Sequence, residues 1–226
     1  MNGLFITSTG TEIGKTFVTA CLCHQLIEAG KPVDAIKPII SGINGADMTG
    51  TDTAVIAESL RLPLDAATID QLSPFRYKAP LAPSMAAALE GKTLDYDALI
   101  TLCKGRLSAS PFTLIEGVGG SFVPLTHNRL VADWISDINL ASVLVAGSYL
   151  GTISHIIATA EAMKTRKLPI TAIVISETAG AGHPDLLKTQ EQIENWTDIP
   201  VVTVPRIKGT EGWKQAPDLL AACLPQ

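Results

Sequence analysis

The chain has 226 residues, of which 46% are hydrophobic and 17% are charged, and its formal net charge is −5. This length supports one sizeable hydrophobic core and is short for two, so we expect a single domain over residues 1–226. The slightly acidic balance argues against a broad surface for nucleic acid or for an anionic membrane, so a small anionic ligand would need a local site.

Short apolar runs alternate along the chain with longer segments of helical pattern. The apolar runs are rich in β-branched residues, and they predict strands at residues 4–8, 33–37, 112–116, 142–146, 170–175 and 201–204. Helices are predicted at residues 15–29, 53–62, 84–90, 96–107, 152–165, 184–196 and 216–223. Residues 73–83 are rich in proline and are expected to form a loop.

This alternation determines the expected fold class. Strands that are apolar on both faces and separated by helices are typical of parallel sheets with helices on both sides. We therefore predict an α/β domain with a mostly parallel sheet, in which ligands bind at the carboxyl ends of the strands.

Three features bear on location. Four cysteines without a C-x-x-C pair predict buried free thiols in a reducing compartment. The N-terminus lacks the basic segment of a signal peptide. Residues 138–160 contain no Asp, Glu, Lys or Arg, but polar residues and glycines interrupt them, so we expect a buried strand and a helix start rather than a membrane span. The expected protein is cytoplasmic, with neither nucleic-acid nor membrane partners.

The segment STGTEIGKT, residues 8–16, lies between the first predicted strand and the first predicted helix. Gly14, Lys15 and Thr16 match the end of the phosphate-binding loop G-x-x-x-x-G-K-[ST], but Thr9 stands where the first glycine belongs. Such a loop binds phosphate through backbone N–H groups at a helix start, so the opening position needs only a tolerable turn. In this context the pattern favours a P-loop NTPase-like domain over a glycine turn that merely caps a helix.

Oxygen ligands for Mg²⁺ are predicted from separate segments. The Thr16 hydroxyl can bind the metal beside the phosphates. Glu116 ends an apolar strand as the acidic residue of a Walker B segment does, and Asp52 lies at a helix start, where a helix cap is the alternative role. Lys37 closes the second predicted strand and would point into the ligand crevice, although its position alone favours a surface lysine equally. The glycine-rich segment EGVGGSFVPL, which begins at Glu116, would let the backbone contact a ligand.

Several motifs, in one order along nearly the whole chain, resemble the dethiobiotin synthetases, the ATP-dependent ligases of biotin biosynthesis. The motifs are GTEIGKT, KPIISG, GTDT, APLAPSMAA, EGVGGSFVPL, ADW and GSYLGTISH. The resemblance implies that ATP, CO₂ and 7,8-diaminopelargonic acid react to dethiobiotin, ADP and phosphate. In that reaction one amine captures CO₂ as a carbamate, the carbamate oxygen attacks the γ-phosphate, and the second amine closes the ureido ring and expels phosphate.

The resemblance also implies roles for individual residues. Lys37 would steady the carbamate and the γ-phosphate, and Lys15 and Thr11 would cover the phosphates, which makes these three the expected catalytic residues. The expected nucleotide-binding residues are Glu12, Ile13, Gly14, Lys15, Thr16, Phe17, Ser176 and Pro205. The expected substrate-binding residues are Lys37, Ser41, Val118, Gly119, Leu150 and Gly151. The expected Mg²⁺ ligands are Thr16, Asp52 and Glu116.

A homodimer is a further implication of the resemblance, because in this family the site is completed across two subunits. Residues 150–155, at a helix start, would receive the substrate carboxylate from the neighbouring subunit.

Two positions differ from the usual family pattern. Ser8 stands where most members have the first glycine of an extended loop. Ser176 and Glu177 stand where the family usually has Asn-Asp, whose asparagine reads the adenine edge. A serine has no amide to match the donor and acceptor of adenine, so we expect loose base selectivity or base contacts from the backbone near residues 204–207.

Other functions fit parts of the pattern. A switch ATPase of the MinD/ParA kind would share the phosphate-binding loop, but such proteins carry a lysine five residues before the loop lysine, where this chain has Gly10. An amidotransferase-type ligase of the cobyrinic acid diamide synthase kind needs a glutaminase domain, for which the chain is too short. A binding module without turnover would not need Lys37 and the metal-binding acids, and an assay separates it from an enzyme.

Overall fold

The computed structural model describes residues 2–43, 47–180 and 182–224, and its main feature is a six-stranded sheet whose neighbouring strands are all parallel. The strands are β1 (Gly3–Ser8), β2 (Asp34–Ile36), β5 (Thr113–Glu116), β6 (Ser142–Gly147), β7 (Ile170–Ser176) and β8 (Val201–Val204). Their order across the sheet is β2-β5-β1-β6-β7-β8. The predicted strands and the predicted parallel sheet are therefore confirmed.

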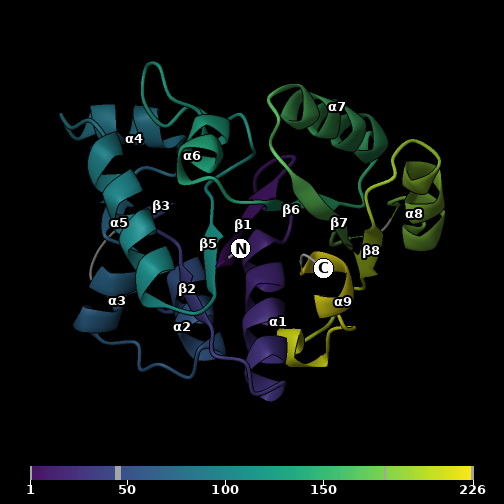
Figure 1. Cartoon of the computed structure of the whole chain (residues 1–226), viewed down its shortest axis with the longest axis horizontal. Coiled ribbons are helices and arrows are strands. Elements are labelled where there is room, and N and C mark those ends of the chain that lie inside the picture. Colours follow the sequence, from purple (N-terminus) through teal and green to yellow (C-terminus); the bar gives the residue numbers. More distant parts are fainter. Residues whose placement is uncertain (1, 44–46, 181, 225–226) are drawn as a thin grey trace.

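Helices cover both faces of the sheet, with α6 and α7 on one side and α1 and α9 on the other (Figure 1). The helices are α1 (Lys15–Glu28), α2 (Asp52–Ser59), α3 (Ala66–Leu72), α4 (Pro83–Leu89), α5 (Tyr96–Ala109), α6 (Val131–Ile138), α7 (Thr152–Thr165), α8 (Leu186–Glu194) and α9 (Leu220–Cys223). Because β1, β5 and β6 are covered on both faces, every residue in these three strands is buried. The site-bearing loops follow the carboxyl ends of these strands.

The proline-rich segment 73–83 is more regular than predicted. It contains the strand β4 (Phe75–Tyr77), which pairs in parallel with β3 (Ile39–Ser41) in a separate two-stranded sheet. The expectation of a loop was wrong here, because a three-residue strand between prolines is too short to show an alternating pattern. The second main strand also ends at Ile36, so Lys37 follows the strand rather than closing it.

The predicted helix at residues 216–223 is wrong over its first half. The structure has a 3₁₀ turn at Gly212–Gln215 and the short helix α9 at Leu220–Cys223. Pro217 explains the break, because a residue before proline avoids helical geometry, and Ala216 has the extended angles φ −64° and ψ 150°.

Within the described ranges, no helix has the length and apolar character needed to cross a membrane.

The four cysteines are free and buried. Burial raises the pKa of Cys23, Cys103 and Cys223 to about 12, and it also raises the pKa of Cys21. A thiol with a raised pKa stays protonated at mildly alkaline pH, and the protonated form is a poor nucleophile. We expect a thiol-reactive aromatic disulfide to label no cysteine rapidly in the folded protein and all four in denaturant. A cysteine that reacts within seconds under native conditions would contradict this prediction.

Candidate functional site

The phosphate-binding loop joins β1 to α1 at the carboxyl edge of the sheet. Gly14 begins α1 in the left-handed conformation, with φ 99°, which glycine adopts readily. A Cβ atom at this position would lie 2.6 Å from Ser176 Oγ, so close packing requires glycine as well. No side chain caps the first turn of α1, and its backbone N–H groups are therefore available to an anionic ligand.

Lys15 is buried among neutral oxygen atoms. Its Nζ donates to Ser8 Oγ at 3.0 Å and to the Gly10 carbonyl at 3.3 Å, and it forms no ion pair with a carboxylate in the described parts of the chain. Burial, and next the nearby Lys37 ammonium, lower the pKa of Lys15 to about 8. A buried cation with only neutral partners favours the binding of an anion such as phosphate.

Ser8, the first residue of the segment STGTEIGKT, takes part in this arrangement. Its hydroxyl lies 2.7 Å from the Gly10 carbonyl and 2.8 Å from the Gly119 carbonyl, besides accepting from Lys15. The serine thus connects the phosphate-binding loop to the glycine-rich segment after β5.

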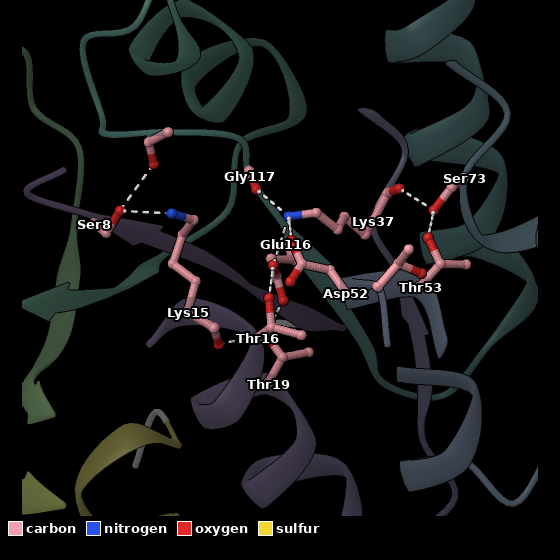
Figure 2. Close-up of polar contacts among 12 residues, drawn as sticks. Ser8, Lys15, Thr16, Thr19, Lys37, Asp52, Thr53, Ser73, Glu116 and Gly117 are labelled. Carbon is pink, nitrogen blue, oxygen red and sulfur yellow. Dashed lines mark hydrogen bonds and ion pairs between the residues drawn. The ribbon is translucent and has the colours of Figure 1, made fainter. Parts of the chain in front are cut away.

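Glu116 lies at the centre of a polar cluster that joins α1 to Lys37 (Figure 2). Its Oε1 accepts hydrogen bonds from Thr16 Oγ1 and Lys37 Nζ, both at 2.7 Å, and its Oε2 accepts from Thr19 Oγ1 at 2.7 Å. Lys37 Nζ also lies 3.0 Å from Asp52 Oδ2. Glu116 is fully buried and Lys37 almost fully, so their charges are weakly screened.

The charges of the cluster stabilise one another. Burial alone would lower the pKa of Lys37, but the Glu116 and Asp52 carboxylates outweigh burial and raise it. Burial would raise the pKa of Asp52, but the Lys37 ammonium holds it below its usual value. The oxygen atoms of Asp52 and Glu116 lie around the Lys37 ammonium, and the Thr16 hydroxyl donates to Glu116, so three hard oxygen ligands of the kind that suits Mg²⁺ belong to one cluster.

A cleft of about 680 Å³ lies between the phosphate-binding loop, Lys37 and the glycine-rich segment. Most of the predicted site residues line it, namely Thr11, Glu12, Ile13, Gly14, Lys15, Thr16, Phe17, Lys37, Ser41, Asp52, Val118 and Gly119. Glu116 lies beneath the cleft, in contact with Thr16 and Lys37. Residues 80–83, which also line the cleft, were not assigned from the sequence, although they belong to the APLAPSMAA motif.

A second cleft of about 330 Å³ adjoins the first and shares residues 12–14 and Phe17 with it. Ser176 and Pro205, the residues expected near the base, line this second cleft. Arg206 lines both clefts; from the sequence, only the backbone of residues 204–207 was assigned to the base, and the Arg206 side chain was given no role. Its backbone N–H donates to Glu177 Oε2 at 2.7 Å.

Leu150 and Gly151 lie away from both clefts. Gly151 begins α7 with φ 97°, and Leu150 is 87% exposed beside a pocket that includes Ile153 and Trp196. The structure therefore does not bring these two predicted substrate-binding residues together with the others of the same chain.

The phosphate-binding loop after the central strand β1, with charged side chains following neighbouring strands, defines a nucleotide-binding protein of the P-loop class. A family model described as "AAA domain" matches residues 2–212. The ATP-dependent dethiobiotin synthetase BioD of Methylobacterium nodulans is 42% identical to this chain, over 81% of this chain and 84% of its own length. The ATP-dependent dethiobiotin synthetase BioD of Caulobacter sp. (strain K31) is 39% identical, over 100% of this chain and 97% of its own length. The chain belongs to the family of ATP-dependent dethiobiotin synthetases.

Solved structures show the same fold at low sequence identity. The MinC:MinD cell division protein complex of Aquifex aeolicus matches with a TM-score of 0.57, at 11% identity over 95% of this chain and 86% of that one. A ParA family ATPase from Chlorobium tepidum matches with a TM-score of 0.52, at 15% identity over 99% of this chain and 91% of that one. At these identities the likeness concerns the fold alone.

Proposed function

We propose that this chain forms dethiobiotin from 7,8-diaminopelargonic acid, CO₂ and ATP. The observation that carries the proposal is that Lys15, at the start of α1, and Lys37, which follows β2, line one cleft. The reaction needs preorganised positive charge both on the phosphates and on the carbamate, and the two lysines supply it. Family membership supports the identity of the substrates.

The proposed mechanism assigns a charge or a hydrogen bond to each residue. After one amine of the substrate has taken up CO₂, Lys37 leaves the carboxylates and holds the carbamate oxygen beside the γ-phosphate. The carbamate oxygen attacks the γ-phosphate, ADP leaves and a carbamic-phosphoric anhydride forms, while Lys15, Thr11 and the first-turn N–H groups of α1 compensate the charge on the phosphates. The second amine then attacks the carbonyl carbon, closes the ring and releases phosphate.

Thr16, Asp52 and Glu116 would hold the Mg²⁺ ion, because their hydroxyl and carboxylate oxygens belong to one cluster that Lys37 leaves when it moves to the carbamate. When bound, the ion supplies charge neutralisation at the phosphate oxygens.

The diamine part of the substrate would contact Ser41 and the backbone at Val118 and Gly119, which line the cleft. The substrate carboxylate would bind at the start of α7 of a neighbouring subunit, near Leu150 and Gly151. Their exposure and their place away from the cleft support a homodimer in which each chain completes the other's site.

We place the reaction in the cytoplasm. All four cysteines are free and buried, which is typical of proteins in a reducing compartment.

A switch ATPase remains the alternative function, since MinD and ParA proteins share the fold. The position of Gly10, where those proteins have a lysine, does not favour it.

The deciding experiment measures phosphate release from ATP with Mg²⁺ and bicarbonate, with and without 7,8-diaminopelargonic acid, and follows dethiobiotin by mass. We expect release that depends on the diamine and equals the product formed. No phosphate release would contradict the proposal. Phosphate release at the same rate with and without the diamine would also contradict it and would favour the switch ATPase.

Base selectivity is expected to be loose, because Ser176 lines the second cleft with a short hydroxyl side chain in place of an amide. A hydroxyl can both donate and accept, so it does not distinguish adenine from cytosine or guanine. We expect turnover with ATP, CTP and GTP to agree within about 10-fold, a difference worth roughly 1.4 kcal/mol. Strict use of ATP would show that other groups, such as the Glu177 carboxylate, read the base.

A further inference from the structure

Lys37 lies in the gap between two sheets, because β2 ends at Ile36 and β3 begins at Ile39. The backbone N–H and C=O groups of Lys37 therefore form hydrogen bonds with residues outside both sheets. The Lys37 N–H donates to the Leu72 carbonyl at 3.0 Å, and the Lys37 carbonyl accepts from Ser73 Oγ at 2.8 Å. The end of α3 thus binds both backbone groups of this lysine.

Ser73 in turn contacts Thr53, with 2.7 Å between the two hydroxyl oxygens. Ser73 has one hydroxyl proton, which goes to the Lys37 carbonyl, so Thr53 is the donor in the second bond. Both side chains are fully buried, which excludes solvent as a substitute partner for either hydroxyl. The two bonds form a directed chain from α2 to Lys37, visible in Figure 2.

The chain of hydroxyl groups closes a ring around Lys37. Thr53 directly follows Asp52, whose carboxylate binds Lys37 Nζ at 3.0 Å. The start of α2 therefore contacts Lys37 twice, at its ammonium through Asp52 and at its carbonyl through Thr53 and Ser73. The second contact does not involve the ammonium, so it persists when Lys37 releases the carboxylates.

We propose that Ser73 and Thr53 are positioning residues, which keep the backbone of Lys37 at a fixed place relative to Asp52 while its side chain moves to the substrate. The inference rests on the proposed function, in which Lys37 contacts the carbamate and the γ-phosphate. Small displacements of a reacting group are costly, and a shift of about 1 Å can lower a rate by on the order of 100-fold.

The first test compares kcat and KM in Ser73→Ala, Thr53→Val and Thr53→Ser. Ser73→Ala removes the donor to the Lys37 carbonyl, and we expect kcat to fall by on the order of 10- to 100-fold with KM for ATP nearly unchanged. Thr53→Val removes the second hydroxyl at nearly constant volume and should lower kcat less. Thr53→Ser keeps the hydroxyl, and it should restore kcat to within about 3-fold of the wild type.

The matched control is Ser59→Ala. Ser59 is also buried in α2, but its hydroxyl donates to the Ile56 carbonyl of the same helix. This variant should keep the wild-type kcat. If kcat of Ser59→Ala fell as much as kcat of Ser73→Ala, the inference would be overturned and a purely structural role would remain. The same would follow if kcat of Thr53→Ser stayed as low as kcat of Thr53→Val.

A second readout does not depend on the reaction. Exchange of the Lys37 amide proton, measured by NMR against the Ile115 amide of β5 as reference, should accelerate in Ser73→Ala and Thr53→Val but not in Ser59→Ala. Unchanged Lys37 exchange in Ser73→Ala would overturn the inference. If the wild type formed no dethiobiotin, this exchange measurement would still decide whether the two hydroxyls anchor Lys37, so the two proposals fail separately.

Discussion

Lys37→Ala is expected to abolish turnover while nucleotide binding persists. Among the described residues, the Lys37 ammonium is the only lysine nitrogen that forms ion pairs with both Asp52 and Glu116, and in the proposed mechanism it holds the carbamate. Removing a preorganised cation from a phosphoryl-transfer site typically costs on the order of 10³-fold in rate. The phosphate-binding loop keeps its backbone groups and Lys15, so the affinity for ATP should change little.

Single-turnover kinetics and titration with a fluorescent nucleotide analogue separate the two effects. Lys92→Ala is the matched control, because Lys92 is an exposed lysine whose only ion pair in the described structure is with Glu90. Activity of Lys37→Ala near that of the Lys92 control would remove Lys37 from the mechanism. Loss of nucleotide binding together with turnover would mean that the variant has lost the fold of the loop rather than a catalytic group.

Gly14→Ala is expected to weaken nucleotide binding strongly. An alanine would have to keep φ near 99°, and its Cβ would lie 2.6 Å from Ser176 Oγ and 2.9 Å from Ser176 Cβ. A strained backbone of this kind costs about 1–3 kcal/mol, and Ser176 Cβ cannot retreat easily because the Ser176 backbone is paired with Val204 in the sheet. The loop would relax out of its binding geometry, so the cost should appear as a loss of affinity of roughly 10- to 100-fold.

A glycine in a different setting provides the control for this prediction. Gly105 lies within α5, and a Cβ there would meet no atom within 4 Å. Gly105→Ala should leave nucleotide affinity unchanged and stabilise the fold by about 0.5–1 kcal/mol. The double variant Gly14→Ala with Ser176→Gly removes the clash but not the strain, and it should recover part of the affinity. Wild-type affinity in Gly14→Ala alone would refute the geometric argument.

The strands of the main sheet were predictable because most are largely buried runs rich in β-branched residues and bounded by polar or glycine-rich segments. Fully buried parallel strands such as β1 and β6 have this simple signal. The two-stranded sheet β3–β4 had no such signal, since its strands are short and one lies between prolines. The last helix was predicted to begin four residues too early, at residue 216 rather than at Leu220, because the apolar, alanine-containing run outweighed the signal of Pro217.

The candidate site was predictable where a residue follows a strand or lies in the phosphate-binding loop. Glu116 and Lys15 were assigned on these grounds, and parallel strands bring such positions to one edge of a sheet. The Arg206 side chain and Ser73 were given no role, because their places depend on how distant segments pack. For Ser73 the partners lie 20 and 36 residues away in the sequence, and no local pattern records those contacts.

The position of β1 in the sheet has a consequence for synthesis of the chain on the ribosome. β1 is complete at Ser8, but its neighbours β5 and β6 begin only at Thr113 and Ser142. At a translation speed of about 5–20 residues per second, the apolar first strand emerges several seconds before either neighbour can pair with it. The nascent chain must therefore shelter this strand, by early collapse of its own helices or with a chaperone, until more than half of the protein has been made.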